Sequence, residues 1–415
     1  MRLRSTAALA ALLALAGAAH ADDPAINLPI GDPARKDRTA PIVLDGATDT
    51  LTGDALTPAE MAARLKDVRV LFVGESHTSQ EFHAVQLATI KALKAAGREV
   101  LIGLEMYPYT EQASLEKWNA GAQGEQDFVN DSRWYKNWGY HWNYYRDIFL
   151  FAKANGIRMY GVNTPREVVS AVRKKGFKDL TPEEAARIPA KIDTEDLEHQ
   201  RLFKAFFGSA DGLHGGMSDE QFTAMFRAQC TWDATMGYNA VQALQQHGGK
   251  DAIMVVLIGS GHVAYGLGAE RQARLWFDGK MASLIPIVVE DEDGKRPTVR
   301  ASYASFLWGV AREDYPAYPS LGMSTAEAKV DGFYKVIMVQ PKSVAAEAGV
   351  KVGDLVTAIE GKPYDDRETF NKLLSEKRWG DTLALTVKRG EESLALTAKL
   401  RRTLREKKAA EGAGK

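Results

Sequence analysis

Short apolar runs that alternate with helical segments constrain this chain more than any other feature of its sequence. The segments Phe82–Ala96 and Tyr144–Ala154 have apolar residues at helical spacing. The runs between such segments lack the polar alternation of a half-exposed strand, which is typical of strands buried on both faces. Strands that alternate with helices predict an α/β fold with a mainly parallel sheet flanked by helices. The predicted strands are Val68–Val73, Val100–Leu104, Arg158–Val162, Ala252–Ile258 and Leu284–Val289.

The length and the change of texture along the chain predict more than one domain. At about 150 residues per domain, 415 residues correspond to two or three domains. Residues 22–55 are rich in Asp, Pro, Thr and Gly and indicate an irregular lead-in to an α/β domain over residues 56–310. Short strands, one helix and glycine turns then indicate a small β-rich domain over residues 316–402. Residues 403–415 are charged and then rich in Ala and Gly, which predicts a disordered tail.

Residues 1–21 have the pattern of a secretory signal peptide. Two arginines precede the apolar run Leu9–Ala16, and Ala19-His20-Ala21 offers a cleavage site between small residues. The run is too short to span a membrane, and no cysteine follows it, so we expect a soluble protein without a lipid anchor. The periplasm is the expected location, because a chain with a single cysteine needs no oxidative folding.

The composition excludes several classes of function. The chain has 53 Lys and Arg residues against 54 Asp and Glu residues, whereas a nucleic-acid-binding protein normally shows a basic excess. The single Cys230 can form neither an internal disulfide nor a thiolate zinc site nor an iron–sulfur cluster. Any bound metal would therefore need ligands from His, Asp, Glu or Tyr.

Two Gly-x-x-His motifs follow directly after predicted strands. The first carries Glu75 and His77, the second carries His262, and Glu105 follows a neighbouring strand. Ligands bind beyond the carboxyl ends of parallel strands, so these side chains should meet in one crevice. Glu75, His77 and His262 can hold a divalent metal that activates water, or the four residues can perform acid–base catalysis without a metal. Alternatively, they only cap and turn the chain.

An aromatic run, Trp134–Tyr145, is the second unusual feature. Seven Trp and Tyr residues and one His fall within it. Large flat side chains suit a flat apolar ligand, and Tyr or His can ligate haem iron. The alternative is that the run packs against the sheet as part of the core. The candidate ligand-binding residues in and near this run are His83, Tyr140, His141, Tyr144, Tyr145 and Arg146.

Polar residues elsewhere in the α/β domain complete the predicted site. Asn163 and Arg166 follow the third predicted strand, where they can hold a carboxylate or phosphate, although the same segment can simply start a helix. Gln229 and Asp233 are four residues apart, on one face of a predicted helix. Asp233 can steady a His or Arg that touches the ligand.

Five motifs in this order resemble the ChaN-like proteins, bacterial haem-binding uptake proteins in the superfamily of the Tiki proteases, the TraB-like proteins and the erythromycin esterases. The resemblance covers about residues 60–290. It implies a haem-binding protein in iron uptake, in which tyrosine ligates haem and two subunits sandwich stacked haems. In hydrolytic relatives the positions of Glu75, His77, Glu105 and His262 are catalytic. Members are often lipoproteins, and this sequence lacks that signal. The motifs are Val73–His77, Leu104–Met106, Asn163–Arg166, Ala228–Met236 and Ile258–Val263.

The segment after residue 315 resembles a bacterial PDZ domain. Gly349 ends a short helix, Gly353-Asp354 turns into a strand, and a hairpin turns at Arg389-Gly390. The resemblance implies a partner that is a peptide C-terminus or a membrane protein: a loop binds the carboxylate of the peptide, and the next strand adds a peptide strand. The alternative is an internal brace or dimer contact. The predicted loop residues are Ser320, Leu321, Gly322 and Met323.

Three functions are consistent with these patterns. The first is an exported haem- or iron-binding protein whose PDZ domain recruits a partner. The second is a periplasmic hydrolase that uses Glu75, His77, Glu105 and His262 on a peptide presented by the PDZ domain. The third is a scaffold with a decayed site. The sequence leaves open whether the chain is an enzyme and whether it forms a homodimer.

Overall fold

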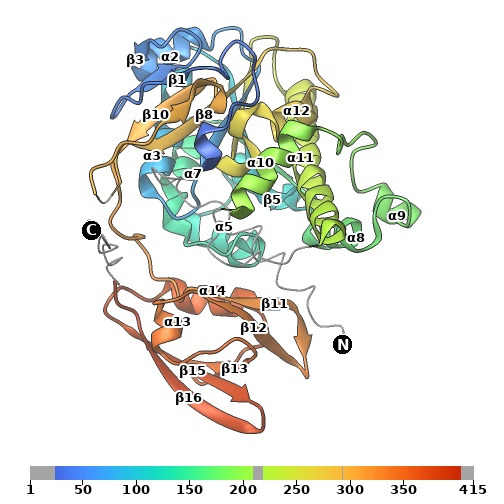
Figure 1. The fold of residues 1–415 in the computed structure, drawn as a ribbon, viewed down its shortest axis with the longest axis vertical. Helices are drawn as coiled ribbons and strands as arrows, with labels where there is room; N and C mark the ends of the chain where they lie inside the picture. Colours follow the sequence, from blue (N-terminus) through green and yellow to red (C-terminus); the bar gives the residue numbers. More distant parts are fainter. Residues whose placement is uncertain (1–23, 209–217, 292, 403–415) are drawn as a thin grey trace, which may run out of the picture.

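The chain folds into two bodies, a large α/β domain followed by a small β-rich domain (Figure 1). A computed structural model describes residues 24–208, 218–291 and 293–402. The predicted signal peptide, residues 1–21, and the predicted tail, residues 403–415, lie outside the described residues. None of the described helices is long and apolar enough to cross a membrane.

The large domain is built on an eight-stranded sheet with the order β3-β2-β10-β8-β4-β7-β5-β6. The six strands from β10 to β6 run parallel, and β2 and β3 extend one edge in antiparallel pairing. The α/β fold with a mainly parallel sheet is thus confirmed. The strands are β2 (Ala47–Asp49), β3 (Ala55–Leu56), β4 (Val70–Glu75), β5 (Val100–Pro108), β6 (Arg158–Asn163), β7 (Ile253–Gly259), β8 (Met281–Val288) and β10 (Phe306–Val310).

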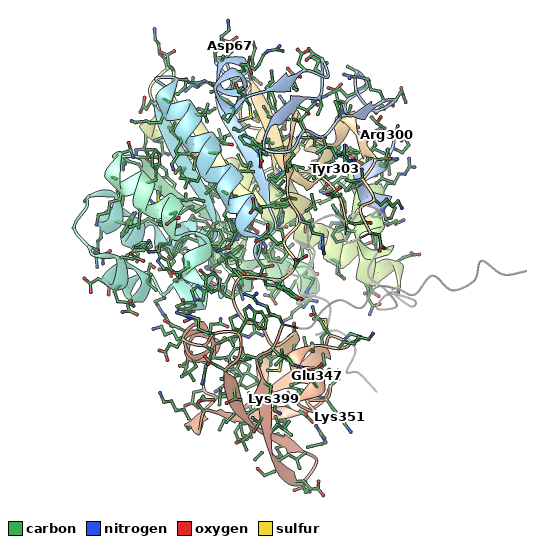
Figure 2. All side chains as sticks on the ribbon, turned by 90° about the vertical axis from the view of Figure 1, so that its left-hand side faces the viewer. Asp67, Arg300, Tyr303, Glu347, Lys351 and Lys399 are labelled. Carbon is green, nitrogen blue, oxygen red and sulfur yellow. The ribbon has the colours of Figure 1, made fainter. Side chains whose placement is uncertain are left out.

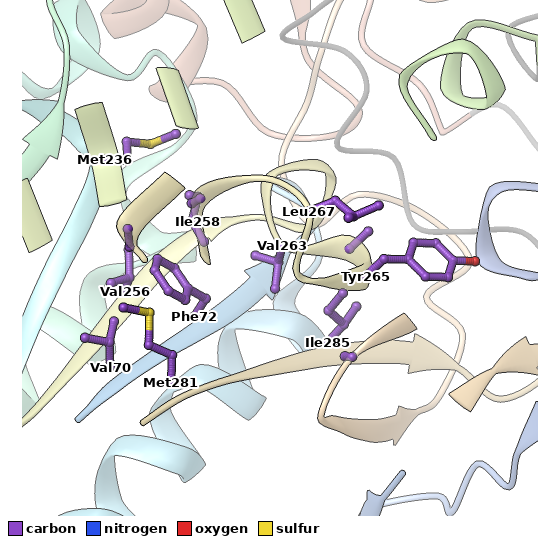
Figure 3. Close-up of a cluster of buried hydrophobic side chains, with 14 of the residues drawn as sticks. Val70, Phe72, Met236, Val256, Ile258, Val263, Tyr265, Leu267, Met281 and Ile285 are labelled. Carbon is purple, nitrogen blue, oxygen red and sulfur yellow. The ribbon is translucent and has the colours of Figure 1, made fainter. Parts of the chain in front are cut away.

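Helices cover both faces of this sheet, because successive side chains of a strand point to opposite faces. Val70 and Phe72 of β4 belong to one hydrophobic core, and Leu71 and Val73 belong to the other. Figure 3 shows part of the first core, in which Phe72 lies near side chains of β7 and β8. The first core also takes side chains from α8 (Arg166–Lys175), α10 (Leu197–Gly208), α11 (Asp219–His247) and α12 (Ala269–Ala273), and the second from α2 (Pro58–Arg64), α3 (Gln80–Ala95), α4 (Gln112–Asn119), α5 (Glu125–Asp131), α6 (Trp134–Asn137) and α7 (Arg146–Ala154).

The structure differs from the sequence prediction in three places. β5 does not end at Glu105 but runs to Pro108, although its ladder with β6 is interrupted after Leu104. The lead-in is not wholly irregular, since it supplies β2 and β3 and a short strand β1 (Thr39–Ala40). The parallel strand β10 has no counterpart in the prediction. Strands of two or three residues, such as β1, β2 and β3, owe their conformation to pairing with a neighbour, and they leave little periodicity to read.

The small domain has a separate sheet with the order β11-β12-β13-β15-β16 and its own hydrophobic core. β11 pairs only with β12 and forms one edge of this sheet, while α14 packs beside it. The elements are β11 (Met323–Val330), β12 (Phe333–Val339), α13 (Val344–Glu347), β13 (Leu355–Ile359), β14 (Lys362–Pro363), α14 (Arg367–Ser375), β15 (Thr382–Arg389) and β16 (Glu392–Lys399).

The two domains touch through α14 and the aromatic run of the large domain. Nδ2 of Asn371 donates to the carbonyl of Tyr135 at 2.9 Å, and Nε2 of His141 lies 3.1 Å from the carbonyl of Ser375. The ring of His141 also stacks on Tyr318 with 3.6 Å between the centroids. In Figure 2 the labelled residues Asp67, Arg300 and Tyr303 lie in the large domain, and Glu347, Lys351 and Lys399 lie in the small one.

Candidate functional site

The two Gly-x-x-His turns lie side by side at the carboxyl edge of the large sheet. β4 and β7 are parallel neighbours, and their register places Glu75 opposite Gly259. The strands approach so closely that a Cβ added to Gly74 would lie 2.8 Å from Oγ of Ser260. Each turn carries its histidine into the lining of one cavity. The structure therefore brings together the two motifs that are 185 residues apart in the sequence (259 − 74).

Glu75 is fully buried, and other side chains occupy both of its oxygens. Oε1 lies 2.7 Å from Nδ1 of His77 and accepts a hydrogen bond from the hydroxyl of Tyr145 at 2.5 Å. Oε2 accepts a hydrogen bond from Nε2 of Gln86 at 2.7 Å and lies 3.5 Å from Nδ1 of His83. Burial opposes the charge, but attraction to His83 and the bonds from His77 and Tyr145 lower the pKa of Glu75 to about 2.

The contact with Glu75 fixes which ring nitrogen of His77 faces the carboxylate and which faces the cavity. An ionised carboxylate can only accept, so Nδ1 of His77 carries the hydrogen that faces Glu75. Among the described residues, Nε2 of His77 has no hydrogen-bond partner, and the side chain lines the cavity. Such a histidine is oriented for use as a base or as a metal ligand through Nε2.

His262 is held in a different way, by Asp233 of α11. Its Nδ1 lies 2.6 Å from Oδ1 of Asp233 and 2.9 Å from Nε2 of Gln229. Its Nε2 lies 3.6 Å from Oε1 of Glu105, whose other oxygen accepts the amide hydrogen of Gly259 at 2.6 Å. Burial disfavours the imidazolium, but the charge and hydrogen bond of Asp233 and the charge of Glu105 raise the pKa of His262. His262 is therefore placed to carry a proton.

The cavity beside the two histidines has a volume of about 360 Å³. This volume lies in the range of about 300–1,000 Å³ that small-molecule sites have. Trp138 and Trp232 give it apolar walls, Lys136 and Arg166 contribute positive charge, and three glutamates contribute negative charge: Glu105, Glu111 and Glu167. The cavity can therefore hold a partly apolar ligand whose anionic groups lie beside Lys136 and Arg166.

Several other predicted residues lie in or directly behind this cavity. Asn163, Arg166 and Gln229 line it, and Nδ2 of Asn163 donates to the carbonyl of Glu105 at 2.8 Å. Asp233 lies behind His262 and is fully buried. Most of the polar residues predicted from the sequence thus lie at the carboxyl ends of the strands or on α11, in or directly behind this cavity.

The aromatic candidates are placed differently. Tyr144 and His141 line a second cavity, between the domains, and Tyr145 is buried against Glu75. Tyr140 also lines the second cavity, but its ring centroid lies 5.0 Å from that of His77. Arg146 forms an ion pair with Glu125 at 2.7 Å, away from both cavities. Most of the run packs in the core, and Trp138 and Tyr140 are the members whose rings lie beside His77, with centroids 4.6 and 5.0 Å from that of the imidazole.

A histidine that the sequence prediction did not include completes the buried network. His199 of α10 lies 3.6 Å from Oδ2 of Asp233, opposite His262. The guanidinium of Arg271 lies 3.1 Å from Nδ1 of His199, and burial lowers the pKa of His199 to about 4. Its only signal in the sequence is a polar residue at a core position of a helix, which does not identify its partner.

The described residues give the metal prediction no support. In the part of the chain that the structure describes, no group of three or more His, Cys, Asp or Glu side chains is arranged to hold a metal ion. Glu75, His77 and His262 do not share a coordination point, because the oxygens of Glu75 already receive Tyr145, Gln86 and Nδ1 of His77.

The small domain has a groove between β11 and α14, where the second cavity has a volume of about 400 Å³. All four predicted loop residues, Ser320 to Met323, line it. The loop is held from behind, because the amides of Ala345 and Gln340 donate to the carbonyls of Leu321 and Gly322 at 2.8 Å each. Gly322 has a φ of 67°, and a Cβ there would lie 2.4 Å from Cβ of Ser343.

The fold and the site define a class: a parallel-sheet α/β protein with paired histidines at the carboxyl edge, joined to a PDZ domain. The chain belongs to the ChaN family of haem-binding uptake proteins of the Tiki superfamily, whose sequence profile matches residues 61–272. A PDZ profile matches residues 319–400. Both resemblances that the sequence motifs indicate are thereby confirmed.

Known proteins of similar sequence or structure match parts of the chain. A structure of ChaN from Campylobacter jejuni, described as showing cofacial haem binding, is 17% identical and covers 64% of this chain and 98% of its own, with a TM-score of 0.51. This likeness confirms the fold.

RETICULATA-RELATED 5, a chloroplastic protein of Arabidopsis thaliana, is 22% identical over 259 residues, which are 59% of this chain and 34% of that protein. The serine protease Do-like HtrA of Lactobacillus helveticus is 33% identical over 70 residues, 17% of each chain. The chain therefore spans about a third of the first relative and about a sixth of the second.

Proposed function

We propose that this chain is an exported protein that binds haem beside His77 and serves haem or iron uptake, while its PDZ domain recruits a partner. The observation that carries the haem assignment is the state of His77. Glu75 holds its Nδ1, and its Nε2 has no hydrogen-bond partner among the described residues of the cavity lining. The family to which the chain belongs is haem-binding.

The side chains of the cavity fit haem in three respects. Trp138 and Trp232 offer flat apolar surfaces to a porphyrin, and Lys136 and Arg166 can bind its carboxylates. His77 offers an imidazole nitrogen that could hold the iron, with the carboxylate behind it that raises its basicity. Haem held by these residues would supply an iron centre to the cavity.

His77 is a better ligand than Tyr140, the predicted tyrosine closest to it. Tyrosine binds iron as the phenolate, and burial together with the charge of Glu105 raises the pKa of Tyr140 well above its usual range. His77 needs no proton loss, because its hydrogen already resides on Nδ1. Tyr140 would then pack beside the haem rather than bind its iron.

A haemin titration of the purified chain, read in the Soret region, tests this assignment. The wild-type chain should give a saturable shift at a low whole-number ratio. His77→Ala should weaken binding about tenfold or more, as expected for loss of an oriented metal ligand. Tyr140→Phe should keep the affinity, and His247→Ala, which changes an exposed histidine, is the matched control. A flat wild-type spectrum would reject haem binding, and loss of binding in Tyr140→Phe alone would assign the iron to the tyrosine.

Export is part of the proposal and rests on the sequence of residues 1–21. Cell fractionation followed by N-terminal sequencing tests it. We expect a periplasmic protein that starts near Asp22, and a full-length cytoplasmic chain would contradict export. A growth assay on haemin as the sole iron source, with and without the gene, tests the role in uptake.

We also propose that two copies of the chain enclose haem between them. The support is that the related Campylobacter jejuni structure is described as binding haem cofacially. The mass of the chain in solution, measured with and without haemin, tests this. Doubling of the mass on saturation supports a haem-linked homodimer, and a monomer at full occupancy rejects it.

A second candidate function, acid–base hydrolysis, is favoured by the unlike surroundings of the two histidines. His77 is oriented through Nδ1 by Glu75 and has an unpartnered Nε2 among the described residues, whereas Asp233 and Glu105 favour the protonated form of His262. A base and an acid that line one cavity are what general acid–base hydrolysis requires. In this reading His77 would take a proton from water, and His262 would give one to the leaving group.

Turnover of ester and peptide libraries by the haem-free chain tests the second candidate. His77→Ala and His262→Ala should each abolish activity, and the rate of the wild-type chain should fall at both ends of the pH range. Equal rates in the wild type and in both variants would reject hydrolysis at this site. No turnover together with tight haemin binding would leave the haem function alone.

A further inference from the structure

The peptide groove of the PDZ domain continues into a basic pocket that belongs to the haem-binding domain. Arg367, the first residue of α14, lines both the groove and this pocket. The other wall of the pocket is one face of α8, from its first residue to its last, so the two domains build the pocket jointly. The basic pocket has a volume of about 500 Å³ and is lined by Arg166, Glu167, Ser170, Ala171, Lys174, Lys175 and Arg367.

Positive charge prevails in this basic pocket. It contains four cationic side chains and one carboxylate, Glu167. Glu167 forms an ion pair with Arg187 at 2.7 Å, and Lys175 forms an ion pair with Glu184 at 2.7 Å. Lys174 is exposed and forms no ion pair among the described residues. The pocket therefore favours an anionic occupant.

Arg367 also limits how far a peptide can pair with the PDZ edge strand. Its guanidinium crosses from α14 to β11 and donates to the carbonyls of Thr325 and Ala326 at 2.7 and 2.9 Å. The register of β11 with β12 shifts between Ser324 and Thr325 and again between Thr325 and Lys329. A peptide can therefore pair with β11 only along its first part, before the carbonyls that Arg367 occupies.

The direction of a bound peptide follows from the position of the loop. A C-terminal carboxylate at Leu321–Gly322 makes the peptide run antiparallel to β11, with its last residue beside Met323 and its earlier residues towards Ala326. At one residue per strand position, roughly the fourth residue from the C-terminus reaches Arg367. The residues before it then lie over the basic pocket.

We propose that the chain recognises protein C-termini in two parts: an apolar last residue in the PDZ groove and acidic residues, from about the fourth position from the end, in the pocket shared with α8. The last residue would lie near Phe370 and Leu374, which line the groove. A peptide carboxylate offers Arg367 a charged partner in place of two carbonyls, and Lys174 a partner that it lacks. This specificity rests on the proposed recruitment by the PDZ domain.

Fluorescence anisotropy with three peptides on the full chain tests the inference. All three end in the same three residues with a C-terminal Val, and the three preceding positions are all Glu, all Gln or all Lys. The Glu peptide should bind about five- to tenfold more tightly than the Gln peptide, as two exposed ion pairs would give, and the Lys peptide should bind most weakly. The difference should shrink at high salt. Equal affinities of the three peptides would overturn the proposal.

Matched variants locate the effect. Lys174→Glu should remove the preference for the Glu peptide while leaving the Gln peptide unchanged, and Arg367→Gln should reduce it. Lys250→Glu, which reverses an exposed charge in the turn before β7, is the control and should change nothing. A preference that survives in Lys174→Glu and Arg367→Gln would overturn the proposal.

Two further controls separate the possible failures. A Glu peptide with an amidated C-terminus should lose binding, because the carboxylate loop then has no anion to hold. If no free C-terminus binds at all, recruitment by the PDZ domain itself is wrong, and haem binding is unaffected. If Lys174→Glu weakens binding to phosphatidylserine vesicles but not to the peptides, the pocket binds a membrane surface and the proposal is wrong.

Discussion

The two Gly-x-x-His turns share a sequence pattern and one cavity, but their histidines rest on carboxylates in opposite situations. Behind His77, Glu75 is fully buried and receives hydrogen bonds from three different side chains. Behind His262, Asp233 is equally buried, yet its Oδ2 has no hydrogen-bond partner among the described residues and lies 3.6 Å from Nε2 of His199. Both oxygens of Glu75 thus receive hydrogen bonds, whereas one oxygen of Asp233 receives none from the described residues.

The difference shows that the Gly-x-x-His pattern determines where each histidine lies, whereas the side chains around its carboxylate determine its hydrogen bonding and charge. Tyr145 and Gln86 donate hydrogen bonds to Glu75, whose Oε1 also orients His77 so that its unpartnered Nε2 lies towards the cavity. Asp233 has fewer donors, so its charge acts on His262 and raises the pKa of that imidazole. An oriented imidazole nitrogen and an imidazole that favours the protonated form therefore face one cavity.

The largest test of this contrast is the loss of each carboxylate. Glu75→Ala should cost about 3–5 kcal/mol of unfolding free energy, because it strands several buried donors at once. Asp233→Ala should cost about 1–3 kcal/mol, since Asp233 satisfies fewer groups. Urea unfolding measures both, with Glu116→Gln as a control in a half-exposed ion pair that should change stability by less than about 0.5 kcal/mol. A greater cost for Asp233→Ala than for Glu75→Ala would contradict the contrast.

The next test places a methyl group between the two turns. A Cβ at Gly259 would lie 3.3 Å from Cε1 of His77 and 3.6 Å from Oε2 of Glu105. The φ of Gly259 is −55°, so alanine fits its backbone without strain. Gly259→Ala should therefore weaken haemin binding about tenfold, or about 1.4 kcal/mol, while changing stability by less than about 1 kcal/mol.

Gly124→Ala is the control, because a Cβ there would meet only Oδ2 of Asp127, at 3.4 Å, and Gly124 lines neither cavity. It should bind haemin as the wild type does. Unchanged haemin affinity in Gly259→Ala would show that the ligand does not lie between the histidines, and the haem assignment to this cavity would fail.

Much of the site follows from the sequence because parallel strands end at one edge. Once Val68–Val73 and Ala252–Ile258 are recognised as buried strands, the residues after them must lie near each other. Asn163 and Arg166 join them for the same reason. Gln229 and Asp233 follow from helical spacing, which puts both on one face of α11. The sequence could not predict that Glu75 receives more hydrogen bonds than Asp233. Their neighbours Tyr145, Gln86 and His199 come from elements whose packing no local pattern encodes.

The aromatic run illustrates the opposite limit. Its density suggests a ligand, but density does not say which face a ring presents. In the structure Trp134 and Tyr145 fill the core, whereas His141 stacks on Tyr318 at the junction with the PDZ domain. That junction depends on a partner domain more than 170 residues away in the sequence (318 − 141 = 177), so no spacing rule could reveal it.

The two turns should also respond at opposite ends of the pH scale. The pKa of Glu75 is lowered to about 2, so its stabilisation is present above its unfolded value of about 4.5 and is lost as the pH falls towards 2. The pKa of His262 is raised, so its stabilisation is complete below about 6.5 and is lost as the pH rises through the folded value. The wild type should therefore exceed His262→Gln in stability most at pH 6 and least at pH 8.5, measured by urea unfolding. His247→Gln, in an exposed position, should show no such trend, and a gap for His262→Gln that widens with rising pH would contradict the assignment.

The smallest effect is expected at Arg146, which borders the aromatic run but contacts neither turn. Its guanidinium pairs with Glu125 at 2.7 and 2.9 Å, with side chains 42% and 32% exposed. Solvent screens such a pair, so Arg146→Gln should change the unfolding free energy by no more than about 0.5 kcal/mol and leave haemin affinity unchanged. Haemin titration and urea unfolding of the same preparation measure both. A loss of haemin affinity in Arg146→Gln would move the ligand away from the paired turns and towards the outer side of α7, and the contrast between His77 and His262 would then no longer describe the binding site.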